Sequence, residues 1–202
     1  INNSIKQCTK DFIKSTKVAI NRVKNYQKKL LPNNLIYKDN TGTKLGCLWK
    51  PISSCGLYIP GGKAIYPSSV FMNAVAAKLA GVDRIVLVSP ARGKKLSSEI
   101  LATAKLAGVN EIYMIGGAQA IAALTYGTRT IRRVDKIFGP GNAFVAEAKK
   151  QVFGDVGIDS VAGPSEVMIV AESGCDPEWI AIDLLSQAEH DEDARVILVS
   201  ES

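Results

Sequence analysis

The sequence predicts an α/β protein with doubly wound, mostly parallel sheets flanked by helices. Continuous apolar runs rich in Val, Ile and Leu recur along the chain, and such runs are typical of parallel strands covered on both faces. Alanine-rich helical patterns separate the runs. The motif Lys78–Asp83 returns 27 residues later as Lys105–Asn110, and each copy ends a helix at a glycine and leads into a strand. Two consecutive βα units of equal length indicate neighbouring crossovers in one sheet.

The first 50 residues predict a helix followed by a β-hairpin. Apolar residues recur every three or four positions along Ile5–Leu30, which is the spacing of an amphipathic helix, and Pro32 ends the pattern. Two short apolar runs, 35–37 and 45–49, then flank the turn residues 39–42, as in a hairpin.

Six further apolar runs predict strands, and helical patterns lie between them. The strands are 56–59, 84–88, 111–115, 134–138, 166–170 and 195–199, and the helices include 70–79 and 100–106. A last helix begins with Asp176–Trp179 and ends at His190.

Composition excludes several classes of protein. With 47% hydrophobic and 22% charged residues in a chain of 202, a packed core is expected, and disorder or a disulfide scaffold is not. No apolar run approaches the roughly 20 residues that span a bilayer, so no membrane partner is expected. The polar start Ile1–Lys6 contains no signal peptide, and the absence of an initiator Met indicates a fragment or a processed piece. Four cysteines without a Cys-x-x-Cys pair predict reduced, buried thiols and a cytoplasmic protein.

Charge is unevenly distributed. Residues 1–50 carry a net charge of +9, residues 51–165 a net charge of +6, and residues 166–202 a net charge of −9. The basic start could bind nucleic acid, but no aromatic residues alternate with its lysines, so a solvated helix face is the preferred explanation. Those lysines are Lys6, Lys10, Lys14, Lys17, Lys24 and Lys28. The opposite charges suggest that both ends belong to one structural unit with the middle inserted.

Glycine-rich turns follow three of the predicted strands: 60–62, 116–120 and 139–142. Glycines let a backbone approach a ligand closely, and the N-terminus of a following helix attracts phosphate. The three turns could therefore hold a dinucleotide at the carboxyl edge of the sheet. None has the G-x-G-x-x-G spacing, so ordinary turns remain the alternative.

Two further places could carry chemistry. Ser165 is not in a G-x-S-x-G motif, so it is expected to be a binding hydroxyl or a turn residue rather than a nucleophile. Gln187 and His190, the only histidine, are three residues apart on one helical face and could share a metal. Two ligands are fewer than zinc usually takes, and a histidine that interacts with the helix dipole is the alternative.

Five segments together resemble the histidinol dehydrogenases. They are 56–62, 116–122, 134–142, 162–166 and 184–190. The resemblance implies an enzyme that oxidises L-histidinol to L-histidine in two NAD-dependent steps through an aldehyde, as the end of histidine biosynthesis. It also implies one zinc per active site and an intertwined homodimer. By similarity, Tyr58, Gln119 and Asn142 contact NAD, Ser165 binds the substrate, and Gln187 and His190 ligate zinc and approach the substrate.

The resemblance also implies a domain arrangement and a departure. Residues 57–165 would form an inserted, incomplete Rossmann-like domain, and 1–56 would join 166–202 in a related second domain. Members of the family are about twice as long, and their catalytic Glu-His pair, their other zinc ligands and the domain that completes the dimer would lie beyond Ser202. We therefore expect no catalytic residue within this chain and little or no activity of the chain alone. The alternative is a non-catalytic fragment that only binds nucleotide.

Overall fold

The computed structural model describes residues 2–61, 65–91, 95–161, 166–189 and 194–201. It divides into two compact units, Ile1–Val161 and Ala162–Ser202, called here the sheet unit and the C-terminal unit. The predicted division into 1–56 plus 166–202 and an inserted 57–165 stays a prediction.

The sheet unit is built on five parallel strands in the order β5-β4-β3-β6-β7. The strands are β3 (Ser54–Tyr58), β4 (Arg84–Val88), β5 (Glu111–Tyr113), β6 (Lys136–Phe138) and β7 (Gly157–Ile158). The chain starts in the middle of the sheet with β3, runs outward to β5, and returns to place β6 on the other side of β3. This order confirms the predicted doubly wound α/β class.

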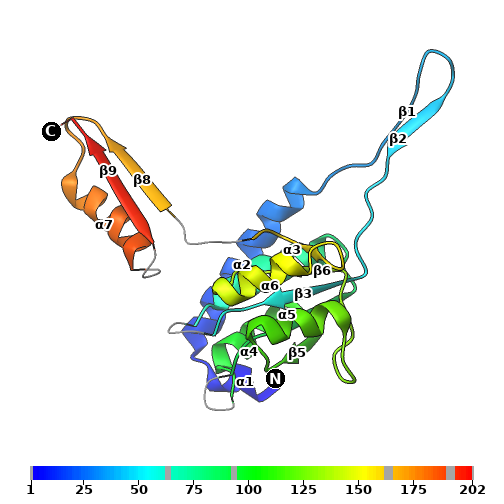
Figure 1. Ribbon diagram of the computed structural model, residues 1–202, viewed down its shortest axis with the longest axis horizontal. Coiled ribbons are helices and arrows are strands. Elements are labelled where there is room, and N and C mark those ends of the chain that lie inside the picture. The colour runs from blue at the N-terminus through cyan, green and yellow to red at the C-terminus, as the bar shows by residue number, and fades with distance from the viewer. Residues whose placement is uncertain (1, 62–64, 92–94, 162–165, 190–193, 202) are drawn as a thin grey trace. The chain divides into compact units, whose positions relative to one another are not determined.

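Helices cover both faces of this sheet (Figure 1). One face carries α3 (Pro67–Leu79) and α4 (Ser98–Ala107), and the other carries α5 (Gly117–Tyr126) and α6 (Ala143–Gln151). Successive side chains of β3 point to opposite faces of the sheet. Cys55 and Leu57 pack against α3 and α4, whereas Tyr58 packs against α5 and α6.

The glycines of the repeated motif adopt the expected left-handed conformation. Gly81 follows α3 with a φ of +86°, and Gly108 caps α4 with a φ of +82°. Each glycine ends its helix, and the chain then turns into the next strand. The prediction of two equivalent βα units is therefore confirmed for β3–α3 and β4–α4.

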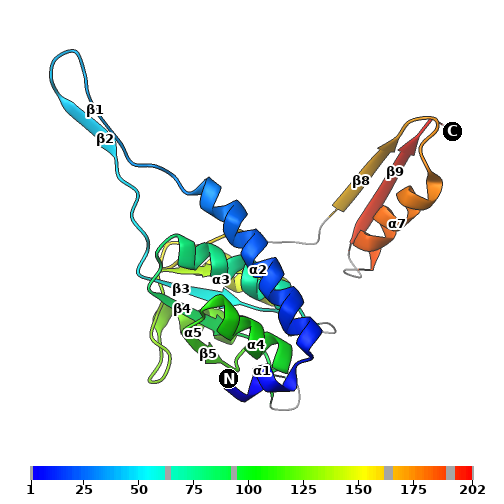
Figure 2. The ribbon, with the colours of Figure 1, turned by 180° about the vertical axis from the view of Figure 1, so that it is seen from behind.

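The predicted N-terminal helix is two helices, α1 (Asn2–Gln7) and α2 (Lys10–Leu30). The break comes at Thr9, whose hydroxyl accepts a hydrogen bond from the N–H of Phe12 over 3.2 Å and so caps α2. Figure 2 shows α2 lying along the helices of one face, where Ile20 and Val23 pack against the core. The six lysines of the basic face are all exposed, which confirms a solvated face.

The predicted hairpin is present as β1 (Leu35–Lys38) and β2 (Lys44–Cys47), with Leu35 opposite Cys47. Asp39 organises its turn, because the carboxylate accepts hydrogen bonds from the N–H groups of Thr41 and Thr43, both over 2.9 Å.

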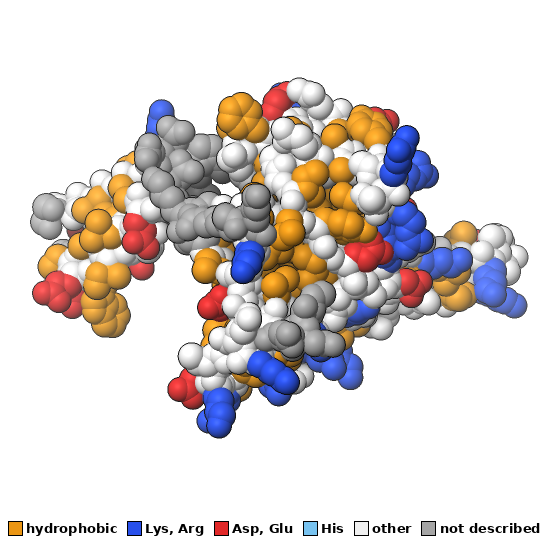
Figure 3. All heavy atoms as spheres, turned by 90° about the horizontal axis from the view of Figure 1, so that it is seen from below, with side chains coloured by type: hydrophobic (Ala, Val, Ile, Leu, Met, Phe, Trp, Pro, Cys, Tyr) orange, Lys and Arg blue, Asp and Glu red, His pale blue; other side chains and the backbone are white. Residues whose placement is uncertain are grey.

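The C-terminal unit is one βαβ motif: β8 (Glu166–Ala171), α7 (Pro177–Ala188) and the parallel strand β9 (Arg195–Ser200). The prediction that these strands are covered on both faces is wrong within this unit, since every residue of β9 is exposed. Figure 3 shows hydrophobic and acidic side chains together on its surface. The large exposed apolar side chains include Met168, Val170, Trp179, Ile182 and Leu185.

All four cysteines are free, as predicted, but only Cys55 is buried. The expectation of buried thiols is wrong for Cys47 and Cys175, which are exposed on the hairpin and before α7, and Cys8 is partly exposed. In the part of the chain that the structure describes, no helix has both the length and the apolar character to cross a membrane.

Candidate functional site

The candidate site lies at the carboxyl edge of the five-stranded sheet, where β3 and β6 lie side by side. After β3 the chain continues to α3 on one face, and after β6 it continues to α6 on the other. The two loops therefore diverge at the point where the strand order reverses. Doubly wound sheets bind their ligands in the crevice at this point.

Tyr58 is the last residue of β3 and reaches toward the start of α5. The residue is 4% exposed, and its hydroxyl accepts a hydrogen bond from the N–H of Gly117 over 3.1 Å. Gly116, the N-cap of α5, provides no side-chain cap. Gln119 folds back over this start, since its Oε1 lies 2.7 Å from where a Cβ on Gly117 would be. The side chains of Tyr58 and Gln119 thus both lie against Gly117, and their predicted nucleotide role stays a prediction.

The loop after β6 passes directly over the end of β3. Gly139 has a φ of +110°, and a Cβ there would collide with the carbonyl oxygen of Tyr58, so only glycine fits. Three residues later, the exposed Asn142 caps α6, and its Oδ1 accepts a hydrogen bond from the N–H of Val145 over 3.1 Å. Tyr58, Gln119 and Asn142 therefore lie at the same edge, at the end of β3 and at the beginnings of α5 and α6.

Pro90, just after β4, lies between two of the glycine turns. A Cβ on Gly61 would lie 2.6 Å from the Cγ of Pro90, and a Cβ on Gly116 would lie 2.6 Å from its Cβ. Both glycines are therefore required by this close approach to the proline ring. The loops after β3, β4 and β5 form a packed set that presents its backbone at the carboxyl edge.

An ion pair holds the backbone of the loop after β6. Lys149 of α6 pairs with Asp159, which follows β7, and both side chains bond the backbone of Gly139. Neither residue was singled out from the sequence. A signal was available for Lys149, because it occupies an apolar-face position four residues after Val145 and three before Val152, both buried.

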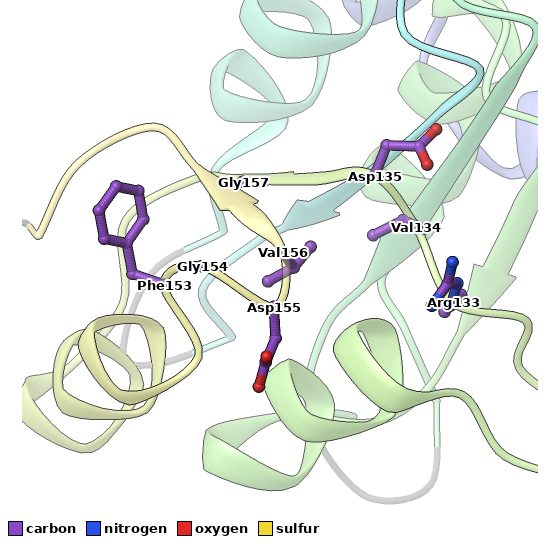
Figure 4. Close-up of a pocket in the computed structure, with 8 residues that line it drawn as sticks. All are labelled: Arg133, Val134, Asp135, Phe153, Gly154, Asp155, Val156 and Gly157. Carbon is purple, nitrogen blue, oxygen red and sulfur yellow. The ribbon is translucent and has the colours of Figure 1, made fainter.

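A second concave surface lies at the opposite edge of the sheet, at the amino ends of β6 and β7 (Figure 4). Two carboxylates line it, but they are engaged separately. Asp135 accepts hydrogen bonds from the N–H and hydroxyl of Ser54 over 2.7 and 3.0 Å, and Asp155 accepts one from the hydroxyl of Tyr126 over 3.0 Å. They do not converge on one point, so this groove is not a candidate acid–base site.

A carboxyl group with a lowered pKa also lies at the amino edge. Arg84 donates two hydrogen bonds to Glu111, over 2.7 and 3.0 Å, and together with Tyr113 lowers the pKa of that carboxyl to about 2. Burial raises the pKa of the Cys55 thiol to about 11, so that thiol is not a nucleophile at neutral pH. Both groups serve the fold rather than the candidate site.

Of the predicted substrate and metal residues, the structure describes only Gln187, in the last turn of α7 and partly exposed. Ser165 and His190 lie outside the described residues. Among residues 2–61, 65–91, 95–161, 166–189 and 194–201, no group of three or more His, Cys, Asp or Glu could hold a metal ion. The zinc pair therefore stays a prediction from the sequence.

The model of the histidinol dehydrogenase family matches residues 1–202, the entire chain. The chain belongs to the histidinol dehydrogenase family. The resemblance read from the five sequence segments is thereby confirmed. Histidinol dehydrogenases are oxidoreductases by name, and histidinol is the substrate that the name states.

Individual relatives agree with this assignment. The chain is 55% identical over 201 residues to a histidinol dehydrogenase from Rhizobium meliloti, covering 100% of this chain and 46% of that protein. It is 57% identical over 183 residues to one from Cereibacter sphaeroides, covering 91% of this chain and 42% of that protein. The crystal structure of histidinol dehydrogenase from Elizabethkingia anophelis matches with a TM-score of 0.94 at 39% identity, covering 100% of this chain and 47% of that chain. The chain spans less than half the length of these relatives.

Proposed function

We propose that this chain is the nucleotide-binding part of a histidinol dehydrogenase that oxidises L-histidinol to L-histidine in two NAD-dependent steps. The observation that carries the proposal is that Tyr58, Gln119 and Asn142 lie at the carboxyl edge of the sheet, where the strand order reverses. The family resemblance assigns NAD contacts to the same three residues. Family membership supplies the substrate class.

The edge suits a dinucleotide on its own geometry. Gly139 packs against the carbonyl of Tyr58 and Gly116 against the ring of Pro90, so these glycines bring the loops close together at this edge. The helices α5 and α6 both begin at this edge, and their N-termini favour negative charge. NAD, when bound, would supply the hydride acceptor. The role of this chain is to bind and orient that cofactor.

Each of the three residues has a distinct task in this proposal. Tyr58, held by the N–H of Gly117, fixes the floor of the site between β3 and α5. Gln119 and Asn142 are exposed side chains with amide groups that can donate and accept hydrogen bonds to ribose or phosphate. Such contacts would orient the nucleotide while the glycine turns carry its phosphates.

Zinc and substrate binding are proposed on the family resemblance. Gln187 and His190 would ligate the metal, with further ligands outside this chain, and Ser165 would bind L-histidinol. The metal's role would be to position and polarise the substrate. A homodimer and a cytoplasmic location are proposed on the same ground.

We further propose that the isolated chain has little or no activity. It lacks a second histidine besides His190, and a residue that ligates a metal does not serve as the general base at the same time. The second candidate function is a fragment that binds nucleotide without turnover, and the coverage of 46% of the Rhizobium meliloti protein favours it for this chain in isolation.

Two measurements test the proposal. Equilibrium dialysis of the 202-residue chain against NAD+ should show binding, and absence of binding would contradict the nucleotide role. Spectrophotometric assay of NADH formation with L-histidinol should show no turnover by the chain alone. Turnover by the chain alone would overturn the prediction of inactivity and the second candidate function together.

A further inference from the structure

Lys149 is a charged residue in the core of the sheet unit. Its side chain is 2% exposed, although it sits in the last turn of α6. An ammonium group in such a place is costly unless charged or polar partners surround it. It has two partners, the Oδ1 of Asp159 and the carbonyl oxygen of Gly139, the latter over 3.0 Å.

Asp159 holds the other side of the same glycine. Its Oδ2 accepts a hydrogen bond from the N–H of Gly139 over 2.7 Å, and its Oδ1 accepts one from the N–H of Ser160 over 2.7 Å. The ion pair therefore binds both polar backbone groups of Gly139, one from each partner. Hydrogen bonds with an ionised partner are stronger than those between neutral groups.

The direction of the α6 side chains explains how Lys149 reaches this glycine. Side chains on a helix lean toward its N-terminus, so a lysine in the last turn extends back toward the loop before the helix. The loop from Gly139 to Asn142 is thus tied at one end by the ion pair, and at the other by the Asn142 cap.

Glycine needs such support more than other residues. It has the most backbone freedom to lose, and Gly139 must hold a φ of +110° against the carbonyl oxygen of Tyr58. If Gly139 moved, the spacing between Tyr58 and Asn142 would change with it.

We propose that Lys149 and Asp159 are positioning residues for the nucleotide: they hold Gly139 so that the turn leading to Asn142 is ordered before the cofactor arrives. The proposal rests on the proposed function for its ligand. A loop that is ordered before binding raises affinity, because binding then loses less conformational entropy. The pair acts through the backbone and does not itself touch the cofactor.

The unmodified chain gives the first test. Amide hydrogen exchange followed by NMR, without nucleotide, should show the N–H of Gly139 strongly protected although it lies in a loop. Lys149→Met should speed its exchange, because Asp159 then loses the cation that fixes it. An unprotected Gly139 amide in the unmodified chain would overturn the proposal.

Binding of NAD+ gives the second test, by calorimetric titration. Lys149→Met should weaken affinity at least about tenfold, as expected when a binding group loses its alignment. The matched control is Arg84→Met, which removes a cation paired with Glu111 at the opposite edge of the sheet. The control should stay within about twofold of the unmodified chain. Equal weakening by both variants would reduce Lys149 to a general stabilising residue and overturn the proposal.

A conservative variant sharpens this comparison. Lys149→Arg keeps the charge and the donors and should bind NAD+ more tightly than Lys149→Met; equal affinities for the two would count against the proposal. If the unmodified chain binds no NAD+, the proposed function fails, and the exchange of the Gly139 amide still decides whether the ion pair orders the loop.

Discussion

The hydroxyl of Tyr58 accepts a hydrogen bond from the backbone N–H of Gly117, 59 positions further along the chain, over 3.1 Å. This bond joins the end of the central strand β3 to the beginning of α5. It therefore couples the position of a proposed cofactor contact to a helix N-terminus that has no side-chain cap.

Removing that hydroxyl should be measurable in stability. Tyr58→Phe leaves the N–H of Gly117 without its acceptor, and we expect the free energy of unfolding to fall by about 1 kcal/mol. Tyr126→Phe is the matched control, because the hydroxyl of Tyr126 bonds Asp155 at an exposed position. Urea unfolding of both variants makes the comparison, and an equal loss in the two would contradict a special role for the Tyr58 bond.

Alanine substitutions at Gly139 and Gly154 can separate the cost of a strained backbone conformation from the cost of a steric collision. Their φ angles are +110° and +111°, but a Cβ on Gly139 would meet the carbonyl of Tyr58, whereas one on Gly154 would meet nothing within 4 Å. Gly154→Ala should cost about 1–2 kcal/mol from the backbone conformation alone. Gly139→Ala should cost clearly more, because backbone must move as well. Thermal unfolding followed by circular dichroism tests this order, and similar losses would show that the loop after β6 yields easily.

Glu111 predicts a pH dependence of stability. Arg84 lowers the pKa of its carboxyl from an ordinary 4.5 to about 2 in the folded chain. The ionised form is favoured by folding, so its contribution is complete above the ordinary pKa and is lost as the pH falls from about 4.5 toward 2. Glu111→Gln should flatten the decline of the unfolding free energy in this range. Urea midpoints measured at several pH values test it, and an unchanged decline would assign the acid sensitivity to other groups.

Asn142 has two roles that two variants can separate. Asn142→Ser keeps an oxygen that can cap α6, so stability should change little, while Asn142→Ala should cost about 1 kcal/mol through loss of the cap. Both variants lose the amide and should weaken NAD+ binding. Calorimetry and unfolding are measured on the same samples. A serine variant that binds NAD+ as well as the unmodified chain would leave Asn142 as a helix cap only.

The features that the sequence predicted well are those with strong local signals. Strands β4, β8 and β9 agree with long runs of Val, Ile and Leu, and Gly81 and Gly108 mark helix ends. The repeated βα unit predicted neighbouring crossovers in one sheet, and β3, β4 and β5 do lie side by side. The resemblance predicted that Tyr58 and Gln119 share a ligand, and in the structure both side chains lie against Gly117.

The features that were missed depend on tertiary contacts or on weak signals. Strand β7 consists of Gly157 and Ile158 only, which is too short for a pattern, and it forms because β6 lies beside it. The break at Thr9 is a single cap inside a continuous apolar stripe. The pairing of Lys149 with Asp159 joins a helix to the end of an edge strand, and no spacing rule in the sequence connects them.

The place of Pro90 between Gly61 and Gly116 makes three loops interdependent. A segment transplanted from a relative after β3 or β5 would fit only if it also carried a glycine where the proline ring presses. Protein engineers who wish to alter these loops would have to keep both glycines, or replace Pro90 together with them.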